Sequence, residues 1–507
     1  MAEFLQQDEL STSSSILLFK ESPAENITLL KRIASLEVPK SHCAKKKDDS
    51  ESSANPVEEG KTEKDDKEKQ KDENRPRIFL RSDSAMEELC SALVKQMKEE
   101  NKENAVINQY DVQIFDLVDL QLAELMQEAP LYQIYEGSGL TPDQWDVHVA
   151  LMGIDGLGLK SLKTILESAA FSAHNRITVS VMTDNIREAK AELKRIFADS
   201  VLTESDGIFE FNSDVVDGPI RIEVKPLPSS SASLTGWLET TQQTEPLTYV
   251  ILDLANTSRA LDILVTLSRF FKTKSEKSDD THLHPTIAIN TTLDDNLRQI
   301  ALTCEGLFPD LKYIESPDKF LNIEKIMNVD LEKDAREYHA KYQDLAFVGE
   351  GTDSKTWQQL DCFTQQSNRE SARFEPVKDA VLNSWLDATG EDKKDFLEKR
   401  FGQKGTLISE EEDGWKKQDD FMDRLMEDPV TLDLFKMEHR RWNLFHLVNG
   451  WEWNKEKNPA LKRHKNLVNS EILMRDYDWV VHYDLMYLLS AYETMKNPQE
   501  TEASNPG

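Results

Sequence analysis

A glycine-containing turn is the first feature whose spacing points to chemistry. The segment VHVALMGIDGLGLKSLKTIL passes from an apolar stretch through Gly153, Gly156 and Gly158 into a helical pattern. Backbone amides at the start of such a helix can bind phosphate, and glycines let the ligand approach. If Gly153 and Gly158 are the first and third motif glycines, Asp155 stands where the backbone must approach a pyrophosphate. The other register, starting at Gly156, reaches Ser161 where glycine or alanine is usual, so we expect a degenerate dinucleotide site.

An acidic residue after the second apolar stretch fits the same chemistry. Asp184 follows RITVSVMT, at the point where dinucleotide-binding folds usually hold a ribose hydroxyl. Asp184 could equally cap the helix that follows, and both roles stay open. NAD or another adenine nucleotide is the candidate cofactor, and our hypothesis is a retained fold whose ligand has been lost or altered.

A second candidate site lies near the C-terminus, in residues 437–478, where tryptophans alternate with basic residues in an otherwise acidic chain. Aromatic rings stack on purines, and arginine or lysine binds phosphate. This combination predicts an adenine-type nucleotide ligand. The alternative is that Trp442 and Trp451 form only the core of a small module. The residues expected to bind the ligand are Glu438, Arg441, Trp442, Asn443, Trp451, Trp453, Lys462, His464, Tyr477 and Asp478.

Other catalytic and metal-binding patterns are weak or missing in the sequence. There is no GxSxG, HExxH or P-loop motif, so we expect no enzyme. His282 and His284 stand beside two aspartates and could bind a metal, but a polar loop is the preferred interpretation, and we expect no metal. The four cysteines have no zinc or disulfide spacing and fit a reducing compartment. They are Cys43, Cys90, Cys304 and Cys362.

Charge and hydropathy exclude several classes of partner. The net charge of -32 repels nucleic-acid backbones and anionic lipids, so we expect no nucleic-acid partner. The sequence has no run of about 18 apolar residues for a membrane span. The first residues carry acids where a signal peptide needs basic and then apolar residues. We therefore expect a cytoplasmic protein.

Strands and helices alternate through the middle of the chain, which predicts a parallel sheet covered by helices, an α/β fold. The expected strands are 146–152, 176–182, 218–224, 247–252 and 285–289, and the expected helices are 159–168, 186–197, 258–271 and 293–304. Residues 351–507 show no β alternation, so we expect that region to be all-α or nearly so, with Gly450 ending the helix that carries Trp442.

The N-terminal region predicts an incomplete unit followed by a linker. Residues 15–35 indicate a short strand and a helix, which must pack on a later part of the chain or on a second copy. Residues 41–75 mix charges of both signs and lack apolar residues, as is typical of a solvated linker. Residues 76–145 predict strands at 76–80 and 112–115, with helices at 84–99 and 117–126.

Residues 112–342 and 437–478 resemble bacterial proteins that couple a TrkA N-terminal, Rossmann-type domain to a ryanodine-receptor repeat (RyR) domain. The RyR resemblance rests on EHRRWN at 438–443, NGW at 449–451, His464–Leu467 and DYD at 476–478. Asn469 and Ser470 replace a usual Pro-Trp. In TQQSNRESAR, Asn368 and Arg369 match a family helix, while Asp155 departs from the family's intact glycine loop.

The resemblance implies a Rossmann-like parallel sheet domain followed by an all-α C-terminal region with an RyR-like module. The implied domains are 1–40 (a partial Rossmann-like remnant), 41–75 (linker), 76–145 (connecting α/β segment), 146–345 (degenerate TrkA-N type), 346–430 (helical connector), 431–495 (RyR-like) and 496–507 (tail).

The function implied is a non-enzymatic sensor or regulatory scaffold that binds a nucleotide-type signal. We expect a homodimer, with a membrane protein or an effector protein as a further partner, and the family links such modules to bacterial antiviral signalling. The runner-up is an NAD-binding oxidoreductase or an NAD-responsive regulator of a transporter or channel. A structural subunit without a ligand is the third alternative.

Overall fold

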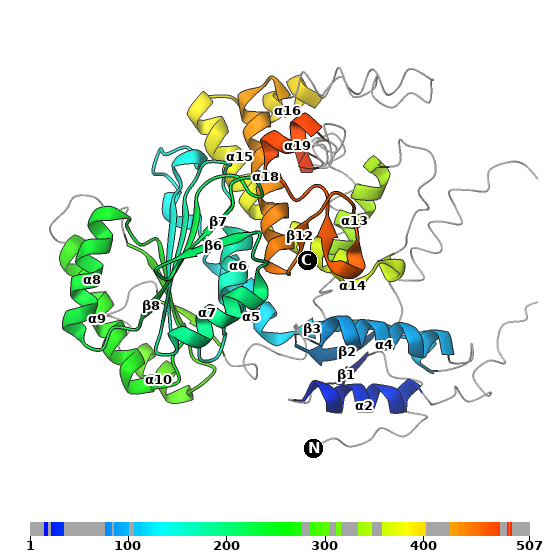
Figure 1. Ribbon diagram of the computed structural model, residues 1–507, viewed down its shortest axis with the longest axis horizontal. Helices are drawn as coiled ribbons and strands as arrows, with labels where there is room; N and C mark the ends of the chain where they lie inside the picture. The colour runs from blue at the N-terminus through cyan, green and yellow to red at the C-terminus, as the bar shows by residue number, and fades with distance from the viewer. Residues whose placement is uncertain are drawn as a thin grey trace, which may run out of the picture. The chain divides into compact units, whose positions relative to one another are not determined.

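The computed structural model describes residues 15–18, 22–34, 77–83, 86–100, 106–275, 284–303, 311–315, 333–346, 357–401, 426–476, 484–485 and 487–488. The chain divides into two compact units. The smaller unit contains residues 1–120 and 360–364, and the larger contains residues 121–359 and 365–507. Each unit has its own parallel strands (Figure 1). The charged linker and the C-terminal tail expected from the sequence lie outside the described residues.

The smaller unit is a parallel sheet in the order β1-β2-β3. Its strands are β1 (Ser15–Leu18), β2 (Arg77–Ser82) and β3 (Asp111–Asp116), and its helices are α2 (Pro23–Ala34), α4 (Glu87–Glu100) and η2 (Val106–Gln109). Apolar residues of α2, α4 and β2 form one core. Because β1 pairs with β2, the N-terminal strand and helix pack on a later part of the same chain, the first of the two alternatives.

The larger unit contains a mixed, mostly parallel sheet in the order β11-β10-β9-β4-β5-β8-β7-β6. Six strands are parallel: β4 (Val147–Met152), β5 (Ile177–Thr183), β8 (Ile220–Pro226), β9 (Tyr249–Leu252), β10 (Thr286–Asn290) and β11 (Lys312–Ile314). The antiparallel hairpin of β6 (Leu202–Ser205) and β7 (Ile208–Phe211) closes one edge. The expected α/β class is confirmed.

The direction of the chain across this sheet reverses between β4 and β9. From β4 the chain proceeds through β5 to β8 on one side, and the later strands β9, β10 and β11 follow on the other side. The carboxyl ends of β4 and β9 are therefore neighbours, and the loops that leave them diverge. Ligands of open α/β sheets bind at such a reversal.

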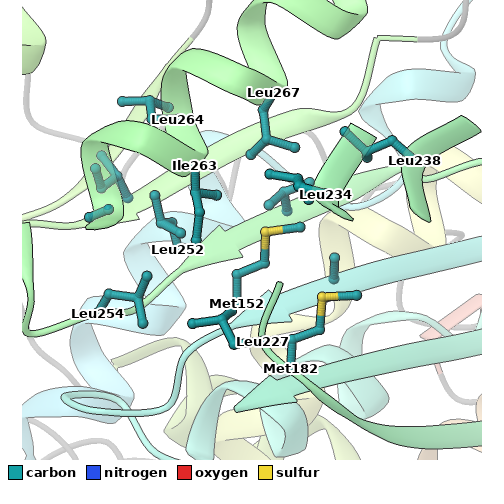
Figure 2. Packing of buried hydrophobic residues seen from close by; sticks show 14 of the residues in the cluster. Met152, Met182, Leu227, Leu234, Leu238, Leu252, Leu254, Ile263, Leu264 and Leu267 are labelled. Atoms are coloured by element: carbon teal, nitrogen blue, oxygen red, sulfur yellow. The ribbon is translucent and has the colours of Figure 1, made fainter. Parts of the chain in front are cut away.

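Helices cover both faces of the sheet (Figure 1). They are α5 (Leu117–Glu128), α6 (Lys160–Ser168), α7 (Ile186–Ile196), α8 (Ser231–Thr244), α9 (Thr257–Ser275) and α10 (Asp295–Thr303). On the face of α8 and α9, Met152 and Met182 pack against leucine and isoleucine side chains from both helices (Figure 2). This apolar layer fixes the ends of β4 and β5, from which the candidate loop residues extend.

The C-terminal part of the larger unit is mainly helical in its described residues. Its helices are α13 (Lys333–Ala346), α14 (Cys362–Arg373), α15 (Glu375–Thr389), α16 (Lys393–Phe401), α18 (Pro429–Val448) and α19 (Ser470–Asp476). Two short strands, β12 (Glu452–Trp453) and β13 (Arg463–His464), form a ribbon that the all-α expectation omitted. Short 3-10 helices are η3 (Gln133–Tyr135), η4 (Pro142–Gln144), η6 (Trp357–Gln359) and η8 (Pro459–Leu461).

Helix α18 is the central element of this region, and local sequence sets its ends. The Asp428 carboxylate accepts a hydrogen bond from the Thr431 amide at 2.9 Å, which caps the first turn. Gly450 follows the last turn with a φ of +78°, as expected for a glycine that ends a helix. Among the helices that the structure describes, none is long and apolar enough to cross a membrane.

Candidate functional site

The glycine loop lies at the carboxyl end of β4, and its amides bind an internal carboxylate. The Gly156 amide lies 3.0 Å from both carboxylate oxygens of Asp253, and the Leu157 amide lies 2.8 Å from Oδ2. Asn290 donates to Oδ1 at 2.7 Å. Asp253 is only 1% exposed. The amides that would bind a phosphate therefore already have an acceptor.

Burial raises the pKa of Asp253, against the opposing effect of its hydrogen bonds from Asn290, Leu157 and Gly156. In the described part of the chain, no lysine or arginine forms an ion pair with this carboxylate. Asp253 directly follows β9, beside the end of β4. Sequence reasoning missed it, although the rule that ligands bind at the carboxyl ends of neighbouring strands could have drawn attention to it.

Two of the three loop glycines are required by this internal packing. At Gly153, where φ is +88°, a Cβ would overlap the carbonyl oxygen of Asp253. At Gly156, a Cβ would lie 2.6 Å from the side-chain nitrogen Nδ2 of Asn290. Gly158 has a φ of +60° and open space around it. The approach of the β9 loop to Gly153, and of the Asn290 and Asp253 side chains to Gly156, thus accounts for these two glycines without a bound pyrophosphate.

The two other acids of the candidate dinucleotide site also have internal partners. Asp155 accepts a hydrogen bond from the Ala255 amide at 2.8 Å. Asp184 forms a bidentate ion pair with Arg259 of α9, in which Nη1 donates to Oδ2 and Nη2 donates to Oδ1 at 3.1 Å. The capping interpretation of Asp184 is wrong, because Asn185 occupies the N-cap position of α7.

In the helical module, Glu438 and Arg441 form a buried ion pair within α18. Arg441 Nε and Nη2 lie 2.9 and 2.8 Å from the two carboxylate oxygens of Glu438. Lys378 Nζ of α15 lies 3.3 Å from the same carboxylate, and Ser371 of α14 accepts a hydrogen bond from Arg441 at 3.0 Å. Burial alone would raise the pKa of Glu438, but the charges of Arg441 and Lys378 lower it overall. Glu438 and Arg441 therefore bind neighbouring helices.

Neighbouring positions of α18 attach the module to loops between the elements of the sheet region. Arg440 is fully buried, and its Nη1 donates to the carbonyl oxygens of Ser172 and Asn175 at 2.7 and 3.0 Å. Asn443 donates to the carbonyl oxygens of Val215 and Val468 at 3.1 and 2.8 Å. Burial lowers the pKa of Arg440 to about 10. Asn443, expected at a ligand, instead joins two segments of the protein.

An aromatic and imidazole cluster lies between α18 and the β12–β13 ribbon. The ring of Trp442 packs on His446 with centroids 3.8 Å apart and meets His464 edge-on at 5.1 Å. Trp451 packs edge-on against His446 at 5.3 Å. Trp451 and His464 are buried, whereas Trp442 is partly exposed. Trp451 and His464 therefore belong to the core, and Trp442 lies at its boundary with solvent.

Burial, more than the neighbouring charges, keeps His446 and His464 of this cluster neutral. Burial, with a smaller effect of Lys457 and Lys465, lowers the pKa of His464 to about 3. Burial also lowers the pKa of His446 well below its usual value. Trp453, opposite His464 in the ribbon, is 43% exposed. His446 and His464 are therefore uncharged near neutral pH, and the positive charge near His464 comes from Lys457 and Lys465.

The remaining candidates are placed as follows. Lys462 is partly buried and donates to the Asn449 carbonyl oxygen at 3.3 Å. The guanidinium of Arg369 lies 6.0 Å from the Trp357 ring centroid. No group of three or more potential metal ligands occurs among the described residues, which include His284. Tyr477, Asp478, His282, Cys43 and Cys304 lie outside the described residues.

Comparison of the chain with models of known protein families gives no match. Searches among curated proteins and among solved structures likewise give no significant match.

Proposed function

We propose that this protein is a non-enzymatic sensor or regulatory scaffold that binds a nucleotide-type ligand on the surface around Trp442. The observation that carries the proposal is the environment of that ring: it is partly exposed, backed by His446 and His464, and near the positive charges of Lys457 and Lys465. This combination suits a purine base that carries phosphate.

Stacking would supply one part of the binding energy. Each base stacked on an aromatic side chain contributes about 1–3 kcal/mol. Trp442 cannot turn freely, because the rings of His446 and His439 pack on it with centroids 3.8 and 5.9 Å from its own. A ring held in place loses little conformational freedom when a ligand binds. The lysines would then attract the phosphate, with the exposed Trp453 at the rim.

The buried members of the expected site would support this surface. Glu438, Arg441 and Asn443 are engaged with neighbouring segments, so we assign them to positioning α18. Trp451 and His464 back the Trp442 ring from inside the module. This division follows the general design in which a rigid inner shell orients a few ligand contacts.

The sheet suits the role of a platform. Its parallel strands follow the order β8-β5-β4-β9-β10-β11, which corresponds to the 3-2-1-4-5-6 order of dinucleotide folds. This order supports the Rossmann-like, TrkA-N type hypothesis, and the resemblance of residues 437–478 supports the RyR-like one. The alternative of an NAD-dependent enzyme or regulator takes second place, because Asp253 occupies the loop amides.

The test is isothermal titration of the full chain with ATP, cyclic AMP and NAD. We expect one of them to bind, Trp442→Ala to weaken that binding at least tenfold, and Trp442→Phe to retain part of it. Lys465→Ala should also weaken binding, whereas Lys393→Ala, on the distant α16, should not. Failure of every nucleotide to bind would contradict the proposal. Binding of NAD that survives Trp442→Ala but is lost in Asp184→Ala would favour the alternative.

A further inference from the structure

We propose that Asp253 is an internal substitute for a ligand phosphate, and that it keeps the crevice of the sheet closed to pyrophosphate-bearing ligands. The proposal is independent of the nucleotide surface around Trp442. It concerns the point where the strand order reverses, between β4 and β9. That point is where an open α/β sheet is built to receive a ligand.

The first step is the chemistry of the contact. A carboxylate with two backbone amide donors, at 2.8 and 3.0 Å, makes the same kind of contact that a phosphate oxygen makes on a glycine loop. Gly156 and Leu157 supply these amides just before α6, which begins at Lys160. An anion is thus already bound at this loop, and it comes from the chain itself.

The second step is the energetic cost of burying the Asp253 carboxylate. A buried carboxylate without a cationic partner is costly unless hydrogen bonds compensate it. Asp253 obtains that compensation from the two amides and from the side chain of Asn290 at 2.7 Å. Because the loop amides and the carboxylate satisfy one another, a ligand phosphate must displace Asp253 and leave its buried charge without the two amide donors.

The third step is that the two neighbouring acids, Asp155 and Asp184, also have partners within the chain. Asp155 fastens the glycine loop to the β9 loop through the Ala255 amide at 2.8 Å. Asp184, the position for a ribose hydroxyl, is held by Arg259. Arg259 also donates to the carbonyl oxygen of Leu227 at 3.4 Å. The phosphate position is therefore occupied by Asp253, and the carboxylate expected to bind a ribose hydroxyl is paired with Arg259.

The closed state makes a specific prediction about variants of Asp253. In Asp253→Ala, the Gly156 and Leu157 amides lose their acceptor and a space opens beside them. A pyrophosphate oxygen can then accept hydrogen bonds from both amides, so pyrophosphate should bind and raise the melting temperature. In Asp253→Asn, a side-chain oxygen of similar shape still accepts from the loop, so the site should stay closed. Asp155→Ala removes the hydrogen bond from the Ala255 amide but leaves Asp253 in place, so in this variant too the site should stay closed.

The experiment measures thermal unfolding and calorimetric binding of the full chain with pyrophosphate, orthophosphate and NAD. The expected result is saturable pyrophosphate binding by Asp253→Ala, at least tenfold tighter than by the natural chain and the two control variants. Orthophosphate and NAD show whether one phosphate suffices and whether a whole dinucleotide fits. Equal binding by the natural chain, or a folded Asp253→Ala that ignores pyrophosphate, overturns the proposal.

Amide hydrogen exchange on the natural chain decides the case if Asp253→Ala does not fold. The proposal requires the Gly156 and Leu157 amides to exchange slowly, with no change when pyrophosphate is added. If they exchange rapidly and become protected by pyrophosphate, the loop is an open site and Asp253 does not occupy it.

Discussion

The guanidinium of Arg440 lies 2.6 Å from the side-chain oxygen of Asn175, and this contact joins α18 to the loop that follows α6. Both residues are fully buried. Asn175 also accepts from the Phe171 and Ser172 amides at 3.2 and 3.1 Å. One asparagine therefore shapes the loop that receives the arginine, and one helix carries both the sheet contact and the candidate ligand surface.

Replacing Arg440 tests how much this contact stabilises the larger unit. Arg440→Met keeps most of the side-chain volume but removes the donors to Ser172 and Asn175. We expect the free energy of unfolding to fall by about 2–4 kcal/mol, as is typical for buried hydrogen bonds to a charged group. The measurement is urea denaturation followed by tryptophan fluorescence. Arg195→Met, at an exposed position, is the control and should change stability by less than about 0.5 kcal/mol. Equal effects would show that Arg440 contributes no more than a surface residue.

Much of the α/β fold follows from local sequence. The stretch Val147–Met152 is continuously apolar except for His148, and such a run is typical of a strand buried on both faces. The β6–β7 hairpin was missed because each of its strands has only four residues. The Asp206–Gly207 dipeptide is a sequence signal for a tight two-residue hairpin turn, and in the structure the two residues have the positive φ values, 51° and 84°, that such a turn requires.

The candidate sites were harder to predict because their contacts join distant residues. Asp253 lies far along the chain from the loop that it closes, and only the pairing of β4 with β9 brings them together. Lys378 and Arg440 carry charges, yet both are buried. Whether a charged side chain is buried depends on partners in other elements, and its local sequence does not contain that information.

Glu438 should give the chain an acid-sensitive step. Its pKa is lowered in the folded state, so its contribution to stability is present above the pKa of the unfolded chain and is lost as the pH falls through the folded value. Glu438→Gln should remove this step below about pH 4.5. It should also cost about 3–5 kcal/mol at pH 7, because Arg441 and Lys378 stay buried without their partner.

The measurement is chemical denaturation between pH 3 and pH 7, with Glu192→Gln as the control. Glu192 forms an exposed pair with Arg195 of the same helix, and exposed pairs contribute about 0–1 kcal/mol. A Glu438 variant that loses no more stability than the Glu192 variant would contradict the buried network.

Asp433 should change the stability of the protein with pH in the direction opposite to Glu438. Burial raises its pKa to about 6, although Trp385 donates to it at 2.9 Å. The folded state therefore holds this proton more tightly than the unfolded chain does. The resulting stability is present below the unfolded pKa of about 4 and is lost as the pH rises through 6. Asp433→Asn removes the titration, so the stability of the variant relative to the natural chain should rise by about 2–3 kcal/mol between pH 4 and pH 7. Parallel urea titrations of both proteins measure this difference, and a difference that does not vary with pH would show that Asp433 titrates normally.

A pair of glycine substitutions tests the packing of the glycine loop without any ligand. Gly153 has a φ of +88°, and a Cβ there would overlap the Asp253 carbonyl oxygen. Gly153→Ala must therefore shift β4 or the β9 loop, and we expect a loss of at least about 3 kcal/mol. Gly236 lies within α8 and has open space around it. Gly236→Ala should stabilise the protein by up to about 1 kcal/mol, because alanine is the better helix former. Melting temperatures of the two variants should thus move in opposite directions from that of the natural chain. If Gly153→Ala were as stable as Gly236→Ala, the β9 loop would not press on the glycine loop, and the closed crevice would lose its structural basis.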